Sequence, residues 1–512
     1  MAGQHLIEAD ARAAKESVLV GDRVHQPGIG FPAATAQRHL LIVRIDLAAG
    51  GDLARRRLLV QEGLARLCGL FARIADGTVT MDVPGDHGLV TRALTHWQFT
   101  ATVAFGPGFF EGLAIPVEKR PRRIRPMPSA EALGDRAPYS MGQTDMLVQL
   151  GATDDFINRF VLENALGADD DGKPLDIMHA LAGWATVADA HAGFQRVDGR
   201  NLQGFLDGTS NPRRLSPLFD RLVWTTFDDE PLALVNGSYL VFQKIVHDLD
   251  QWRVIDLDEQ QEWVGRTRGT GLLLGTLSEE DDDALFAAMH SADDKTRTAA
   301  RARWQALIDA QSDPEARLYD RVPANGDIPN RCPAWSHVRK VNPRNEDHNP
   351  AIPERLIFRR GYPFIEPGPD GRARSGLLFV CFQRDVATGF EAIKRDFAGA
   401  RNFPVPGARP FTPRERDIRH WGGRFSVAEL HALTADQRAA LGLGNPDDFA
   451  DALANAADPR AQETGPEGLA GPSENGISPT GESLAIVALG GGYYFVPPIP
   501  DKDLARIGQQ FF

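Results

Sequence analysis

The chain has 512 residues, of which 42% are hydrophobic and 24% charged, a balance typical of a globular protein. This length is sufficient for two or three domains. The formal net charge of −13 argues against nucleic acid as a partner, because nucleic-acid binding needs a basic surface. No apolar run is long enough to span a membrane and no signal peptide is evident, so we expect a cytoplasmic protein without a membrane partner.

The three cysteines, Cys68, Cys332 and Cys381, do not form a CxxC pair. This spacing gives little support to a cysteine zinc site or an iron–sulfur cluster. Cys68 lies in a helical pattern and Cys381 in a strand pattern, so we predict that both are buried as small apolar residues.

In the first half of the chain, hydrophobic periodicity predicts strands at 39–47, 97–105 and 146–150. Apolar positions after Asp52 recur at spacings of three and four, which predicts an amphipathic helix capped by that carboxylate. These positions are Val60, Leu64, Leu67, Phe71 and Ile74. A second helix follows the strand at 146–150 and carries Phe156, Phe160 and Val161.

The second half repeats this order of elements. Strands at 237–246 and 377–382 are each followed by a predicted helix, and two further strands, at 484–489 and 493–496, are separated by three glycines.

This repeated order favours an α+β fold made of two ferredoxin-like halves, with antiparallel sheets and peripheral helices. We place the N-terminal half at residues 1–200 and the C-terminal half at 201–512.

The stretch Gly-Phe-Leu-Asp-Gly-Thr-Ser-Asn-Pro at 204–212 places Asp207 between Gly204 and Gly208. Glycine adopts backbone conformations that other residues avoid and allows a flat ligand to approach closely. A carboxylate on such an open loop suits proton transfer, although Asp, Gly and Asn-Pro are also ordinary turn residues. The residues alone leave both interpretations open.

Two later segments contain further candidates. His337 lies within Trp-Ser-His-Val-Arg-Lys-Val-Asn-Pro-Arg at 335–344, and Arg359 and Arg360 close a predicted strand before a Gly-Tyr-Pro-Phe turn at 361–364. Successive side chains of a strand point to opposite faces, so only one of the two arginines can face a bound ligand.

Together these segments resemble the dye-decolourising peroxidases, a family of haem enzymes. Residues 204–208 resemble the GxxDG signature of that family, 335–344 resemble the segment that carries its proximal haem ligand, and 359–364 resemble its second signature. The three motifs occur in the order of the family, and the resemblance extends from about residue 39 to the C-terminus. The length and the Arg-Arg-Gly-Tyr-Pro-Phe form are similar to the longer members.

The resemblance implies a peroxidase with one haem b per chain, bound in the C-terminal half. It implies that His337 is the axial iron ligand, that Asp207 moves the proton of hydrogen peroxide, and that Arg359 stabilises the developing negative charge. It also implies contacts to the cofactor from Gly204, Gly208 and Thr209. Organic donors such as phenols and dyes would then supply single electrons, and a homo-oligomer is left open.

The alternative function is a haem-binding or iron-releasing protein of the same fold, with incidental peroxidase activity. His247 and His348 compete with His337 as the ligand, although we interpret His247 as part of a capping turn and His348 as exposed. Trp252 and Tyr362 are candidate surface sites for electron transfer. No carboxylate partner for His337 is evident.

Overall fold

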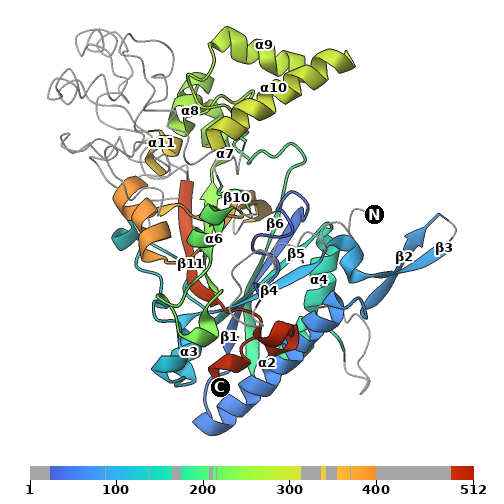
Figure 1. Cartoon of the computed structure of the whole chain (residues 1–512), viewed down its shortest axis with the longest axis vertical. Coiled ribbons are helices and arrows are strands. Elements are labelled where there is room, and N and C mark those ends of the chain that lie inside the picture. Colours follow the sequence, from blue (N-terminus) through green and yellow to red (C-terminus); the bar gives the residue numbers. More distant parts are fainter. Residues whose placement is uncertain are drawn as a thin grey trace.

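The structure, a computed structural model, describes residues 24–86, 88–135, 138–163, 174–206, 211–214, 216–312, 336–341, 355–368, 371–398 and 486–512. Its described strands form one nine-stranded sheet and one separate two-stranded hairpin (Figure 1). The strands are β1 (His39–Leu47), β2 (Thr80–Gly85), β3 (Gly88–Ala93), β4 (Thr100–Phe105), β5 (Met146–Ala152), β6 (Ala185–Phe194), β7 (Ser238–His247), β8 (Phe358–Arg359), β9 (Tyr362–Pro367), β10 (Ala373–Gln383) and β11 (Ile486–Val496).

Helices surround the sheet. The longer ones are α2 (Leu53–Ala75), α3 (Pro107–Gly112), α4 (Asp155–Glu163), α5 (Ile177–Leu181), α6 (Pro217–Val223), α7 (Leu249–Val254), α8 (Leu257–Val264), α9 (Glu279–Met289), α10 (Asp294–Ser312), α11 (His337–Val341) and the π-helix η7 (Ala387–Ala398). Short 3-10 helices are η1 (Leu94–Trp97), η2 (Val117–Lys119), η3 (Glu131–Leu133), η4 (Leu232–Leu234), η10 (Pro500–Lys502), η11 (Leu504–Arg506) and η12 (Gln509–Phe511).

The N-terminal half has the strand order β6-β1-β5-β4 with antiparallel pairing throughout, as in a ferredoxin-like fold. Helices α2 and α4 pack beside these strands (Figure 1). The Asp52 side chain caps α2 by accepting a hydrogen bond from the Arg55 N–H at 3.0 Å. All five apolar positions predicted for this helix are buried, so the predicted helix and its cap are confirmed.

The C-terminal half repeats the arrangement with the strand order β11-β7-β10-β8, and β9 also pairs with β10. Asp385 caps the helix that follows β10, because its Oδ1 accepts a hydrogen bond from the Ala387 N–H at 2.8 Å. The expected fold of two ferredoxin-like halves is confirmed. Cys68 and Cys381 are both buried as expected, whereas Cys332 lies outside the described residues.

The two halves share one continuous sheet, because Phe105 of β4 pairs with Phe495 of β11. The far edges of this sheet also meet. Gln195, just after β6, donates a hydrogen bond to the Gly361 carbonyl at 2.5 Å. Nearby, the buried Lys244 contacts both Glu366 of β9, at 2.7 Å, and His191 of β6, at 3.2 Å. The C-terminal half therefore contacts the N-terminal half at two places. One is the pairing of β4 with β11, and the other is the contact of β6 with β9 and Lys244.

Some local predictions were wrong. β11 is one strand that continues through its three glycines. At Gly491 the strand lies so close to β7 that a Cβ would be 1.9 Å from the Phe242 carbonyl oxygen. Glycine therefore permits close pairing there and does not interrupt the strand. Trp97 belongs to η1 and not to β4, and Tyr362 to Pro367 form β9 where a turn was expected. The β2–β3 hairpin and the α9–α10 pair were not predicted.

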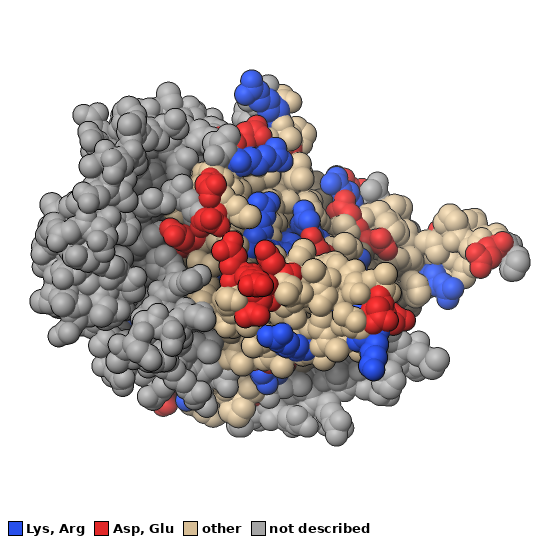
Figure 2. Space-filling view, turned by 90° about the horizontal axis from the view of Figure 1, so that it is seen from above, with Lys and Arg blue, Asp and Glu red and all other residues tan. Residues whose placement is uncertain are grey.

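Within the described part of the chain, no helix is both long enough and apolar enough to cross a bilayer. On the face shown in Figure 2, described acidic and basic side chains are interspersed. The expectation that the protein does not bind nucleic acid stays a prediction.

Candidate active site

The candidate site is built on β8, a two-residue strand at the end of the sheet. Arg359 pairs with Cys381 of β10, so their side chains lie on the same face. Cys381 belongs to an apolar cluster that includes Phe390 of η7. Burial raises the pKa of the Cys381 thiol, and the charge of Arg359 opposes this shift, which agrees with their proximity. Arg359 therefore lies on the side of the sheet that η7 covers.

Arg360 points to the opposite face and is 2% exposed. Its Nη1 donates to the carbonyls of Ile29 at 3.1 Å and Pro32 at 2.6 Å, and its Nη2 donates to Gln37 Oε1 at 3.0 Å. The prediction that the two arginines face opposite sides is confirmed. Arg360 binds the irregular N-terminal segment, which leaves Arg359 as the arginine on the η7 side.

Arg359 is half-buried and is held by Asn211. Asn211 Oδ1 accepts hydrogen bonds from the Arg359 backbone N–H at 3.0 Å and from Nε at 3.3 Å, while Asn211 Nδ2 donates to the Arg359 carbonyl at 2.8 Å. Asn211 lies four residues after Asp207, so the structure brings the end of the first motif onto the arginine of the third. Asp207, Gly208 and Thr209 themselves lie outside the described residues.

His337 is half-buried and is the first residue of α11. α11 packs against η7 and α8. Val341, one turn further along, joins the apolar cluster that contains Phe390 and Cys381. The helix that carries His337 and the strand that carries Arg359 therefore pack on the same apolar cluster, on the same side of the sheet.

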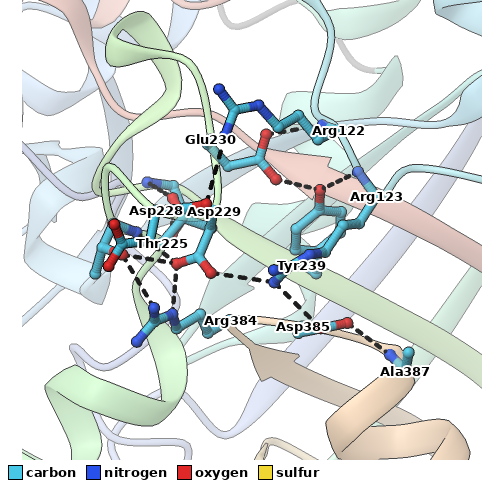
Figure 3. Close-up of polar contacts among 12 residues, drawn as sticks. Arg122, Arg123, Thr225, Asp228, Asp229, Glu230, Tyr239, Arg384, Asp385 and Ala387 are labelled. Carbon is cyan, nitrogen blue, oxygen red and sulfur yellow. Dashed lines mark hydrogen bonds and ion pairs between the residues drawn. The ribbon is translucent and has the colours of Figure 1, made fainter.

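The start of η7 is fixed by an ionic cluster around Asp229, which is 4% exposed (Figure 3). Asp229 binds Arg384 Nε, and its other oxygen contacts Arg123 Nη1 at 3.1 Å. Arg123 also contacts Asp385, the residue that caps η7, at 3.1 Å. Burial raises the pKa of Asp229, but the hydrogen bonds led by that from Arg384 outweigh burial and hold the pKa below its ordinary value. The cluster thus positions the helix on which α11 packs.

A second part of this cluster reaches β7 (Figure 3). The Tyr239 hydroxyl donates to Glu230 Oε1 at 2.5 Å and accepts from the Arg123 backbone N–H at 3.0 Å. Glu230 Oε2 accepts from the Arg122 N–H at 2.8 Å. Burial raises the pKa of Glu230 despite these bonds. The segment around Arg123 is therefore attached to β7 and η7 together.

Gly204 has a φ of +92°, a conformation that suits glycine. A Cβ there would lie 2.6 Å from Arg268 Nε. The structure thus shows why glycine stands at this position, and the contact of Gly204 with a cofactor stays a prediction.

His247 is the strongest competitor of His337 among the described histidines. It ends β7 and pairs with Ser375 of β10, which places its side chain on the Arg359 face. Burial lowers its pKa to about 4, so the imidazole is neutral, and among the described residues its Nδ1 has no hydrogen-bond partner. Its side chain is buried at the end of β7, and the capping expected here is made by the next residue, Asp248, whose Oδ1 accepts from the Asp250 N–H at 3.0 Å. His348 lies outside the described residues.

The two aromatic residues suggested for surface electron transfer are both buried. Trp252 is 3% exposed, and its Nε1 donates to the Gln203 carbonyl at 3.3 Å. Tyr362 is fully buried, and its hydroxyl donates to the Gln37 carbonyl at 2.9 Å. Neither side chain offers the exposed ring that a bulky donor would contact.

This face of the sheet fits a haem in its donor chemistry. It combines histidine nitrogens suited to axial ligation with a fixed guanidinium suited to a developing negative charge. Among the described residues, no group of three or more His, Cys, Asp or Glu side chains could hold a metal ion without such a cofactor. These residue types are compatible with the class of haem-dependent enzymes.

Comparison with protein families agrees with this class. The N-terminal model of the DyP-type peroxidases matches residues 26–195, and the C-terminal model matches residues 198–403. The chain belongs to the DyP-type peroxidase family, which binds haem and acts on peroxide.

Individual relatives cover most of the chain. A dye-decolorizing peroxidase of Thermobifida fusca is 28% identical over 75% of this chain and 81% of the relative. A deferrochelatase of Escherichia coli K12 is 27% identical over 77% of this chain and 81% of the relative. The solved structure of DtpA from Streptomyces lividans matches with a TM-score of 0.52 and 25% identity, over 75% of this chain and 89% of DtpA.

Sequence reasoning missed Asn211 as a functional candidate. The Asn-Pro pair was interpreted as a turn, and Asn211 instead binds a strand 148 residues away. The signal was present in the motif, because Asn carries both a donor and an acceptor, but the pairing partner depends on the tertiary structure.

Proposed function

We propose that the protein binds one haem b per chain in its C-terminal half and uses hydrogen peroxide to oxidise phenols, dyes or similar organic donors in one-electron steps. His337 would hold the iron through a ring nitrogen. When bound, the haem supplies the iron at which peroxide is reduced and carries the oxidising equivalents to the donor.

Asp207 and Arg359 would act on the peroxide. Peroxide is a weak acid, so the Asp207 carboxylate takes a proton from the inner oxygen and delivers it to the outer oxygen, which leaves as water. A free Asp titrates near ~3.9, so this base stays ionised at acidic pH where a histidine base is protonated. Arg359 stabilises the negative charge that develops as the O–O bond breaks.

The observation that best supports this proposal is the placement of Arg359. Its guanidinium is fixed by Asn211 on the η7 side of the sheet, while its neighbour Arg360 is committed to the opposite face. Asn211 also connects the Asp207 motif to this arginine.

The ligand assignment is tested by adding haem to the purified protein and recording the visible spectrum. We expect the Soret band of a histidine-ligated ferric haem, and His337→Ala should weaken haem retention. His247→Ala and His348→Ala are the matched controls. If either control loses the haem while His337→Ala keeps both haem and spectrum, the ligand is reassigned to that histidine.

The proton-transfer role is tested by Asp207→Asn, which keeps the shape of the side chain and removes the base. Stopped-flow mixing with peroxide between pH 3 and 8 should show a slower reaction with haem retained. A wild-type rate for this variant would remove Asp207 from the proposal.

The alternative is an iron-releasing protein, and the deferrochelatases among the relatives favour keeping it under test. Peroxide-dependent oxidation of a dye supports the peroxidase. Release of iron from the bound haem, in a protein that does not turn over peroxide and dye, supports the alternative.

A further inference from the structure

β8 leaves part of its backbone directed away from the sheet. Arg360 N donates to the Val380 carbonyl of β10 at 2.8 Å, so Arg360 directs its backbone N–H toward that strand. In an antiparallel pair, alternate residues direct their N–H and C=O groups to opposite sides. Arg359 therefore presents both backbone groups at the outer edge of β8, where the order of the sheet ends.

Asn211 occupies this edge in place of another strand. Its side-chain amide pairs with both backbone groups of Arg359, at 3.0 Å to the N–H and 2.8 Å to the carbonyl. Unpaired edge groups are costly when water is excluded, so this pairing stabilises β8 at the residue that bears the guanidinium.

The same Asn211 Oδ1 also accepts from Arg359 Nε at 3.3 Å. A guanidinium has five N–H donors, and binding Nε leaves the four donors on the terminal nitrogens free of this contact. The three bonds also fix the orientation of the amide, because a reversed amide would place its NH₂ group against two N–H donors. Backbone and guanidinium of Arg359 are thus fixed by one neutral side chain.

We propose that Asn211 is a positioning residue for Arg359, and this inference rests on the proposed role of Arg359 with peroxide. A neutral amide fixes the guanidinium without neutralising its charge. A carboxylate at this position would accept the same two N–H donors but would oppose the positive charge that stabilises the breaking O–O bond.

The geometry is tested without any catalytic readout, by amide hydrogen exchange of the full chain resolved at the Arg359 N–H, with and without haem. Asn211→Ala removes the acceptor, and we expect exchange to be about 10-fold faster or more. Asn211→Asp keeps the acceptor of this N–H but loses the Nδ2 donor to the Arg359 carbonyl, so we expect its exchange to lie between that of the wild type and that of Asn211→Ala.

Asn201→Ala is the matched control. Asn201 lies on the same stretch of chain and also uses Oδ1 to accept a backbone N–H, that of Phe205, at 3.0 Å. It tests general loosening of the loop, and the Arg359 amide should exchange in this variant as in the wild type.

The functional consequence is tested by a double-mutant cycle on the haem-loaded protein. We expect Arg359→Leu to slow the reaction with peroxide by about 10²–10³-fold and Asn211→Ala to slow it by about 10-fold. If Asn211 acts through Arg359, adding Asn211→Ala to Arg359→Leu causes no further loss. Asn211→Asp should react at least as slowly as Asn211→Ala although its Arg359 amide is the better protected of the two, because the carboxylate opposes the positive charge of Arg359.

The outcomes separate the two ideas. A wild-type rate for Asn211→Ala beside a slow Arg359→Leu overturns the positioning role and leaves the proposed function intact. Additive losses in the double variant also overturn it, because Asn211 would then act by another route. A wild-type rate for Arg359→Leu overturns the proposed role of Arg359 and the inference together.

Discussion

Arg359 and Arg360 are neighbours in the sequence, but they occupy two different environments on opposite faces of the C-terminal sheet. Arg360 is 2% exposed, and three acceptors from residues 29–37 bind its terminal nitrogens. Arg359 is half-buried, and Asn211 is the one described side chain that hydrogen-bonds its guanidinium, through Nε.

The difference separates a structural cation, Arg360, from Arg359, the cation that we propose acts on peroxide. The terminal nitrogens of Arg360 are bound by the protein, so they contribute to packing of the N-terminal segment. Asn211 holds Arg359 through its backbone and Nε, and it does not bind the terminal nitrogens of the guanidinium. Preorganised but available donors are what electrostatic catalysis requires.

The largest expected effect is that of Arg359→Leu on the reaction of the haem-loaded protein with peroxide. Loss of a donor that stabilises developing charge typically costs about 10²–10³-fold in rate. Stability should change little, because the side chain is only half-buried. Stopped-flow kinetics and thermal unfolding measured on the same preparation check both statements, and a large loss of stability would place Arg359 with Arg360 as a structural cation.

Arg360→Leu should show the converse. Removing the guanidinium leaves the buried carbonyls of Ile29 and Pro32 without a donor, so we expect a loss of about 3 kcal/mol in the free energy of unfolding. Arg214→Leu is the control, because Arg214 is exposed and binds the same segment through the Gly30 carbonyl at 3.1 Å. Denaturant unfolding measures both, and equal losses would show that Arg360 has no special role.

The sequence was sufficient to predict the two faces of this dipeptide, because strand alternation follows from local geometry. It also predicted the repeated order of strands and the helix capped by Asp52, since periodicity and caps are local signals. It did not predict that Asn211 binds Arg359 or that His247 is buried beside Ser375. Both depend on tertiary contacts between segments more than 100 residues apart, a side-chain contact for Asn211 and strand pairing for His247.

The ionic cluster around Asp229 provides a third environment, in which buried charges position the start of η7. Asp229→Asn keeps the shape of the side chain but removes the charge that binds Arg384 and Arg123, so we expect a loss of about 2 kcal/mol in the free energy of unfolding. Asp228→Asn, at the adjacent exposed position, should change it by less than about 0.5 kcal/mol. Equal effects would indicate that the charge of Asp229 contributes nothing specific.

The smallest expected effect is the pH dependence of the ion pair between Lys244 of β7 and Glu366 of β9. Burial raises the pKa of Glu366, but hydrogen bonds and ion pairs with Lys244 and Arg374 outweigh burial and hold the pKa below its ordinary value. A carboxyl with a lowered folded-state pKa adds stability above its unfolded value near ~4.3 and loses it as the pH falls through the folded value. The free energy of unfolding measured from pH 6 to pH 3 should therefore fall less in Glu366→Gln than in the wild type.

Glu230 should show the opposite behaviour, because burial raises its pKa and its protonation favours the folded state as the pH falls. Glu230→Gln should therefore make the free energy of unfolding fall more steeply between pH 6 and pH 3. If both variants shift this pH profile in the same direction, the contrast fails. The ion pairs of Glu366 and the burial of Glu230 then do not have opposite effects on stability in acid.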